Sequence, residues 1–205
     1  MSTEDEIQRL VNQQKEGERN RQLEKFREER EFWVAMQTAW DSYVSRCREI
    51  AVVLEREGVP TIPLYGLKVL KKSFLRPNGG FKLIEFGRGW SLHESEASRA
   101  ILGVIGTDGQ MYRELRECSS PNVIGNEYWK HMHPHHVPFD LMRERVRKHS
   151  YKTSAPTSTW DYKIIDGELV MSAEVSGWDH TYTETVTASV SATEFAAKQI
   201  SKARG

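Results

Sequence analysis

Apolar residues recur at alternating spacings of three and four positions between residues 26 and 54. Such spacing is typical of a helix that buries one seam along its length. Gly58 suits the position that follows a helix, and Pro60 cannot continue one. We therefore predict a long amphipathic helix that ends near residue 57, with Cys47 within its seam. The predicted interaction seam consists of Phe26, Trp33, Met36, Trp40, Tyr43, Ile50 and Leu54.

The chain before residue 26 lacks this seam. Thr3 and Glu6 have the spacing of a capping box, which predicts a helix start, and Ile7, Leu10 and Val11 give a short apolar stripe. Residues 13–22 are polar apart from Gly17. We expect residues 1–25 to form a charged helical arm that is either a solvated helix or partly disordered. Residues 26–205 are expected to form a single α+β domain.

After Pro60 the pattern becomes strand-like, with turns between short apolar runs. Two hairpins are predicted around 106–109 and around Asp166-Gly167, because Asp-Gly turns suit the twist of paired strands. Helices are expected at 67–75, at 139–149 with Asp140 as its cap, and at 194–202 after Ser191 or Thr193. The predicted fold is α+β: a long N-terminal amphipathic helix packed on an antiparallel β-meander, with a short internal helix and a C-terminal helix.

The composition limits the classes of function. Lysine plus arginine and aspartate plus glutamate both number 29, so the formal net charge is zero, which argues against coating nucleic acid through bulk charge. No apolar run has the length of a membrane span, and the acidic N-terminus lacks the apolar core of a signal peptide. Two cysteines are too few for a disulfide framework. We expect a reduced, cytoplasmic protein, and take a bacterial or phage source as a working assumption.

Four histidines lie between residues 131 and 136. In an extended segment His131 and His133 would share a face, roughly 6.6 Å apart at about 3.3 Å per residue. Neutral imidazole is a common ligand of zinc and similar divalent metals. A metal site would use His131 and His133 with a third ligand from His93 or Asp140. The competing interpretation is a polar loop that binds no metal.

Basic residues also gather around a turn. Lys71, Lys72 and Arg76 flank Phe74, and such groups neutralise phosphates while an aromatic ring stacks on a base. The equal number of acidic residues favours the alternative, a solvated surface. No known nucleic-acid recognition motif is present.

No pattern of catalytic residues is recognisable. The chain lacks the Gly-x-Ser-x-Gly elbow, the phosphate loop and the His-Glu-x-x-His motif. We predict a non-enzymatic protein-interaction or assembly protein that acts through its N-terminal helical arm and a β-sheet surface, binding itself or another protein. The first alternative is a metal-binding protein or metal-dependent enzyme that uses the 131–136 histidines. The second is a nucleic-acid-binding protein. No membrane and no cofactor other than that metal are expected.

Overall fold

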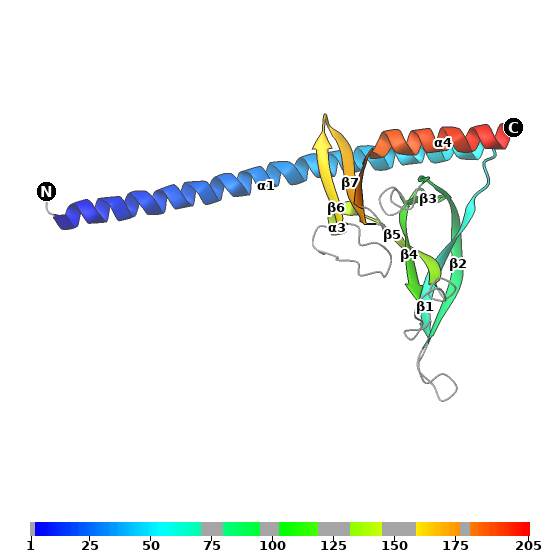
Figure 1. Cartoon of the computed structure of the whole chain (residues 1–205), viewed down its shortest axis with the longest axis horizontal. Helices are drawn as coiled ribbons and strands as arrows, with labels where there is room; N and C mark the ends of the chain where they lie inside the picture. The colour runs from blue at the N-terminus through cyan, green and yellow to red at the C-terminus, as the bar shows by residue number, and fades with distance from the viewer. Residues whose placement is uncertain (1–2, 71–79, 95–102, 119–131, 145–158, 177–180) are drawn as a thin grey trace. The chain divides into compact units, whose positions relative to one another are not determined.

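The computed structural model describes residues 3–70, 80–94, 103–118, 132–144, 159–176 and 181–205 (Figure 1). The chain divides into two compact units, Met1–Thr38 and Ala39–Gly205. The helices are α1 (Thr3–Arg56), α3 (Leu141–Glu144) and α4 (Ala188–Arg204). The strands are β1 (Ile62–Leu70), β2 (Gly80–Ser91), β3 (Val104–Gly106), β4 (Met111–Cys118), β5 (Met132–Pro138), β6 (Thr159–Ile165), β7 (Glu168–Ser176) and β8 (Thr181–Thr187).

Helix α1 ends where the sequence predicts. Gly58 has a φ of 67°, a conformation that glycine adopts at little cost. Its N–H donates to the carbonyl of Glu55, and the N–H of Val59 donates to that of Leu54, both at 3.0 Å. These two bonds form a Schellman motif, which satisfies carbonyls that the end of a helix leaves open. The predicted position of Gly58 after the helix is confirmed.

The second unit contains a five-stranded antiparallel sheet with the order β1-β2-β3-β4-β5. A bulge at Leu64 and Tyr65 interrupts the pairing of β1 with β2, and bulges increase strand twist. Strands β1 and β5, at the two ends of the order, also lie in contact. The sheet is therefore strongly curled. Its interior contains a core cluster of Leu64, Val104 and Tyr112.

The last part of α1, from Ala39 to Arg56, belongs to the second unit. The Trp40 ring meets the Phe139 ring edge to face, with 5.2 Å between ring centres. Arg48 donates from Nε to the carbonyl of Gly109 in the β3–β4 turn, at 3.1 Å. Tyr43, Cys47 and Leu54 on the same seam are buried. The predicted packing of the helix on the chain's own sheet is confirmed for this part of α1.

Strands β6, β7 and β8 form a separate three-stranded antiparallel sheet. Asp166 and Gly167 join β6 to β7 with φ values of 53° and 80°. Positive φ at both central residues is the mark of a type I′ turn, and Asp-Gly favours it. The second predicted hairpin is thus confirmed.

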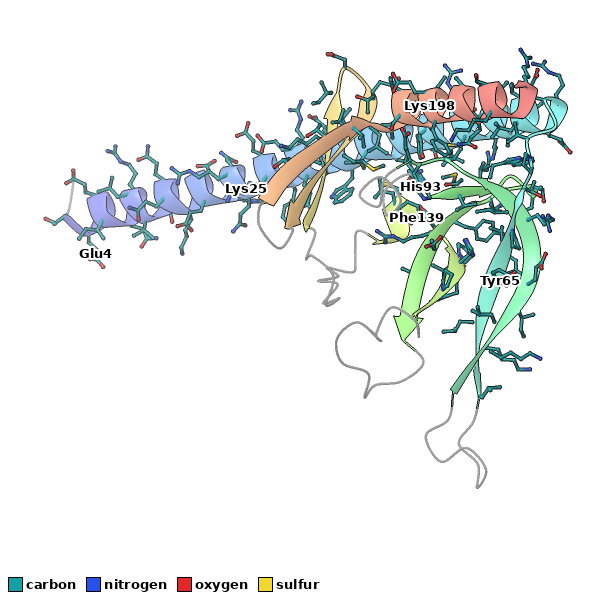
Figure 2. The ribbon with its side chains drawn as sticks, turned by 45° about the vertical axis from the view of Figure 1, so that its right-hand side comes forward. Glu4, Lys25, Tyr65, His93, Phe139 and Lys198 are labelled. Atoms are coloured by element: carbon teal, nitrogen blue, oxygen red, sulfur yellow. The ribbon has the colours of Figure 1, made fainter. Side chains whose placement is uncertain are left out.

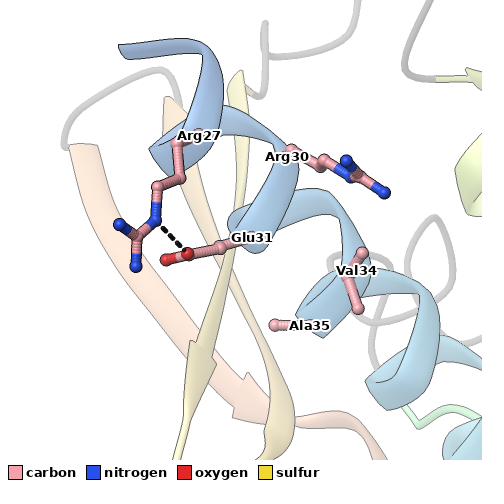
Figure 3. A pocket seen from close by; sticks show the side chains of 5 residues that line it. All are labelled: Arg27, Arg30, Glu31, Val34 and Ala35. Atoms are coloured by element: carbon pink, nitrogen blue, oxygen red, sulfur yellow. Dashed lines mark hydrogen bonds and ion pairs between the residues drawn. The ribbon is translucent and has the colours of Figure 1, made fainter. Parts of the chain in front are cut away.

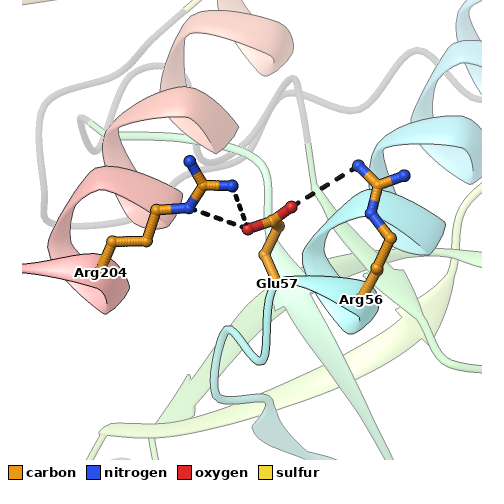
Figure 4. Close-up of polar contacts among 3 residues, drawn as sticks. All are labelled: Arg56, Glu57 and Arg204. Atoms are coloured by element: carbon orange, nitrogen blue, oxygen red, sulfur yellow. Dashed lines mark hydrogen bonds and ion pairs between the residues drawn. The ribbon is translucent and has the colours of Figure 1, made fainter.

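Helix α4 contacts β7 and β8. Its buried residues are alanines spaced four apart: Ala188, Ala192 and Ala196. At its end Arg204 donates from Nε to Glu57 at 2.9 Å, and Arg56 lies 3.6 Å from the other carboxylate oxygen (Figure 4). The hydrogen bonds from Arg204 lower the pKa of Glu57.

The α+β fold class is confirmed, with a long first helix, antiparallel sheets of five and three strands and a C-terminal helix.

Some boundaries were predicted wrongly. Residues 67–70, predicted as the start of a helix, continue β1 instead. They pair with β2, with Leu67 opposite Leu83, and this pairing outweighs the helical spacing of their apolar side chains. Helix α4 begins at Ala188, since its buried alanines extend the apolar face towards β8. Thr193 therefore lies inside the helix, where its hydroxyl donates to the carbonyl of Ser189. Residues 71–75 and 145–149 of the predicted helices lie outside the described ranges.

Candidate functional site

The seam of α1 changes from exposed to buried along its length. The Phe26 side chain is 70% exposed, whereas Met36 is 2% exposed. From Trp40 onward the predicted seam residues Tyr43, Ile50 and Leu54 are all buried, while Trp33 is partly exposed. The inner seam is therefore core, and the residues that remain available to a partner lie at its N-terminal end.

Burial also determines the chemistry of the one free cysteine among the described side chains. Cys47 is fully buried, and burial raises the pKa of its thiol to about 12. A thiol with such a pKa is almost entirely protonated near neutral pH, and the thiolate is the nucleophilic form. Cys47 is thus part of the packing and is unsuited to nucleophilic catalysis.

A shallow hollow lies on the first unit, on another side of α1. It has a volume of about 420 Å³ and is lined by Arg27, Arg30, Glu31, Val34 and Ala35 (Figure 3). Arg27 donates from Nε to Glu31 at 2.9 Å. Val34 and Met36 are two positions apart, so they lie about 160° apart around the helix axis. The hollow therefore lies nearly opposite Met36 on the helix.

Large apolar side chains along the first unit, including one that lines the hollow, are exposed. Each of Ile7, Leu10, Leu23 and Val34 has more than half of its surface exposed. An arm that presents apolar groups among charged ones can hold an apolar partner and orient it through charge.

The predicted metal ligands are only partly within the described residues. His131 and the side chain of His133 lie outside them, although the backbone of His133 is part of β5. His93 is buried, with Nδ1 3.2 Å from the Gly103 carbonyl and 3.0 Å from the Ser91 hydroxyl (Figure 2). Asp140 accepts the N–H of Met142 at 3.0 Å, as a cap for α3. The side chains that the structure describes contain no cluster of three metal-ligating residues. The metal site stays a prediction.

The predicted nucleic-acid site falls wholly outside the described residues. This applies to Lys71, Lys72 and Arg76. On the described strand that follows, Arg88 is already engaged, because it donates from Nε to the Thr61 hydroxyl at 2.7 Å and from a terminal nitrogen to the Thr61 carbonyl at 3.0 Å. Nucleic-acid binding through this turn also stays a prediction.

The burial of three polar residues was not predicted from the sequence. Arg113 is buried on β4, with its guanidinium 5.1 Å from the centre of the Phe139 ring, a cation–π arrangement. His135 and His136, which belong to the histidine cluster of the predicted metal site but were not named as its ligands, are also buried. His136 accepts a hydrogen bond at Nδ1 from the N–H of Tyr65, at 3.1 Å. No local pattern marks this bond, because its partners are 71 positions apart.

Comparison of the chain with known protein families, with curated proteins and with solved structures finds no match. Among the described helices, none has the length and apolar character needed to cross a bilayer.

Proposed function

We propose that this protein is a non-enzymatic assembly protein whose N-terminal helical arm, together with the exposed part of α1 that follows it as far as residue 38, binds a second copy of itself. The observation that carries the proposal is the exposure of Leu23 and Phe26 on a helix that is entirely exposed from residue 12 to residue 32. An isolated helix gains little stability from its own hydrogen bonds, and most helices depend on packing of an apolar face. A partner that covers these residues would supply that packing.

The charge distribution of residues 3–38 supports a second copy in antiparallel orientation. Residues 3–18 contain five acidic and two basic side chains, whereas residues 19–38 contain four acidic and five basic ones. A parallel pair would bring the two acidic segments together. An antiparallel pair brings each acidic segment against the more basic one, which lowers the repulsion.

A second surface lies on the five-stranded sheet. Ile84 and Phe86 are both substantially exposed on β2. A Cβ atom on Gly66, the residue paired with Ile84, would lie 3.5 Å from the Phe86 ring, so the two side chains share a face. Phe86 also contacts the Tyr112 ring, with 5.4 Å between ring centres. This apolar face supports the proposed role of a β-sheet surface in assembly.

Sedimentation equilibrium of the full chain tests the proposal. The wild type is expected to associate, and the double substitution Leu23→Ser/Phe26→Ser is expected to make it monomeric without unfolding the second unit. The matched control, Gln22→Ser/Lys25→Ser, changes the same two turns and is expected to leave association intact. A wild-type chain that sediments as a monomer at about 100 μM would overturn the proposal, because the dissociation constant of the pair would then exceed that concentration.

A further inference from the structure

The bond between Tyr65 and His136 joins the two end strands of the curled sheet. Tyr65 lies on β1 and His136 on β5, the first and last strands of the order. The backbone N–H of Tyr65 can only donate, so Nδ1 of His136 must carry a lone pair. A neutral His136 then holds its proton on Nε2. That nitrogen is buried and has no hydrogen-bond partner among the described residues.

The register places His136 inside the curl. His136 pairs with Glu114 on β4, so it shares a face with Tyr112, two positions along. Tyr112 belongs to the interior cluster with Leu64, the residue before Tyr65. The His136 side chain is 6% exposed. Protonation would therefore place a charge on a buried side chain and turn Nδ1 into a second donor facing the Tyr65 N–H.

The titratable groups around His136 come from several elements. On β5 itself His135 is adjacent and buried. Glu114 occupies the paired position on β4, Glu85 on β2 pairs with Tyr65, and Asp108 accepts the hydroxyl of Tyr112. Burial lowers the pKa of His136, and the neighbouring His135 lowers it further. Glu114 is the closest in register of the three carboxylates, and a negative charge there would favour the imidazolium.

We propose that His136 is a proton-operated latch at the seam between β1 and β5. Neutral His136 accepts the Tyr65 N–H and holds the two strands together. Protonated His136 releases that N–H, and the strands separate at this point. Separation exposes two strand edges, and exposed edges are templates for pairing with another chain.

The sign of the pH effect follows from the lowered pKa. Between the folded pKa of His136 and the usual histidine value of about 6.5, the unfolded chain binds more protons than the folded one. The contribution of His136 to stability is fully present above about pH 6.5 and is lost as the pH falls below that value.

The tautomer of His136 in the wild-type chain is the first test. Long-range proton–nitrogen correlation spectra at pH 7.5 are expected to show the proton on Nε2. A proton on Nδ1 would overturn the proposal, because that nitrogen could not accept the Tyr65 N–H. This measurement needs no substitution.

Hydrogen exchange at the Tyr65 amide is the second test. Its protection factor is expected to fall severalfold between pH 7.5 and pH 5 in the wild type, because protonation of His136 favours the opened form. In His136→Asn the amide oxygen can take the place of Nδ1 but cannot titrate, so protection should stay constant. His93→Asn, at another buried histidine, should behave as the wild type. An equal loss of protection in His136→Asn and the wild type would overturn the proposal.

Discussion

The close approach of β2 to β3 leaves no room beside one glycine residue. A Cβ atom on Gly89 would collide with the carbonyl oxygen of Ile105, whereas one on Gly87 would lie 3.9 Å from the flexible side chain of Leu64. We expect Gly89→Ala to lower the free energy of unfolding by about 2 kcal/mol or more, because backbone atoms must shift. Gly87→Ala is the matched control and should change it by less than about 0.5 kcal/mol. Urea unfolding of both variants measures the two changes in the free energy of unfolding. Equal losses in the two variants would contradict the crowding beside Gly89.

The buried thiol of Cys47 gives a prediction about reactivity. With a pKa of about 12, its thiolate fraction at pH 8 is on the order of one in ten thousand. In a Cys118→Ser background, which leaves one thiol, a disulfide reagent should react with the native chain at least about 100-fold more slowly than with the unfolded chain. The reaction in urea serves as the control. Rapid modification of native protein would show that Cys47 is accessible.

The histidines show how far single residues could be predicted. The sequence offers an extended segment only as a condition of the metal site, beside a polar loop, whereas β5 covers Met132–Pro138. It does not show that His135 and His136 are buried, since that depends on strands that pair from distant parts of the chain. The His136 partner comes from β1, which no spacing within residues 131–136 can reveal.

Helix α1 combines a core segment with an exposed one. One substitution in each segment tests how much that segment contributes to the free energy of unfolding. Trp40 is buried against Phe139, so Trp40→Ala should lower the free energy of unfolding by about 3–5 kcal/mol. Phe26→Ala removes an exposed ring and should cost less than about 0.5 kcal/mol. Urea unfolding must be measured at a protein concentration that keeps the chain monomeric, because association adds stability. A large loss in Phe26→Ala under these conditions would contradict this division of α1.

The elements that could be predicted are those whose cause is local. The Asp166-Gly167 hairpin depends on two residues whose backbone conformation fits a tight turn. The end of α1 depends on Gly58 in the same way. Residues 67–70 could not be assigned, because the spacing of Leu67 and Leu70 suits a helix and only pairing with β2 selects the strand.

At the scale of the whole molecule, the division into two units predicts that the arm, residues 1–25, can be removed without unfolding the second unit. A chain that begins at Phe26 retains all of Ala39–Gly205, with its own sheets and buried residues. We expect it to unfold cooperatively with a midpoint close to that of the monomeric full chain, and to sediment as a monomer. Calorimetry and sedimentation equilibrium measure the two properties. Self-association that survives the deletion would place the assembly surface elsewhere.

The partition of eight described strands into two sheets could not be predicted from hydrophobic pattern. The pattern indicates strands and turns, but strand order depends on which edges meet. The sequence also could not show that the strands at the two ends of the larger sheet lie in contact.

The turn at Asp166 and Gly167 has a practical consequence. Both residues and their neighbours Ile165 and Glu168 are exposed, and exposed loop tips tolerate inserted sequence. A short epitope or a fluorophore-accepting peptide placed between Asp166 and Gly167 should leave the thermal midpoint within about 4 °C of the parent chain. The turn thus offers a position, remote in sequence from the arm, from which assembly can be followed optically without altering the residues proposed to cause it.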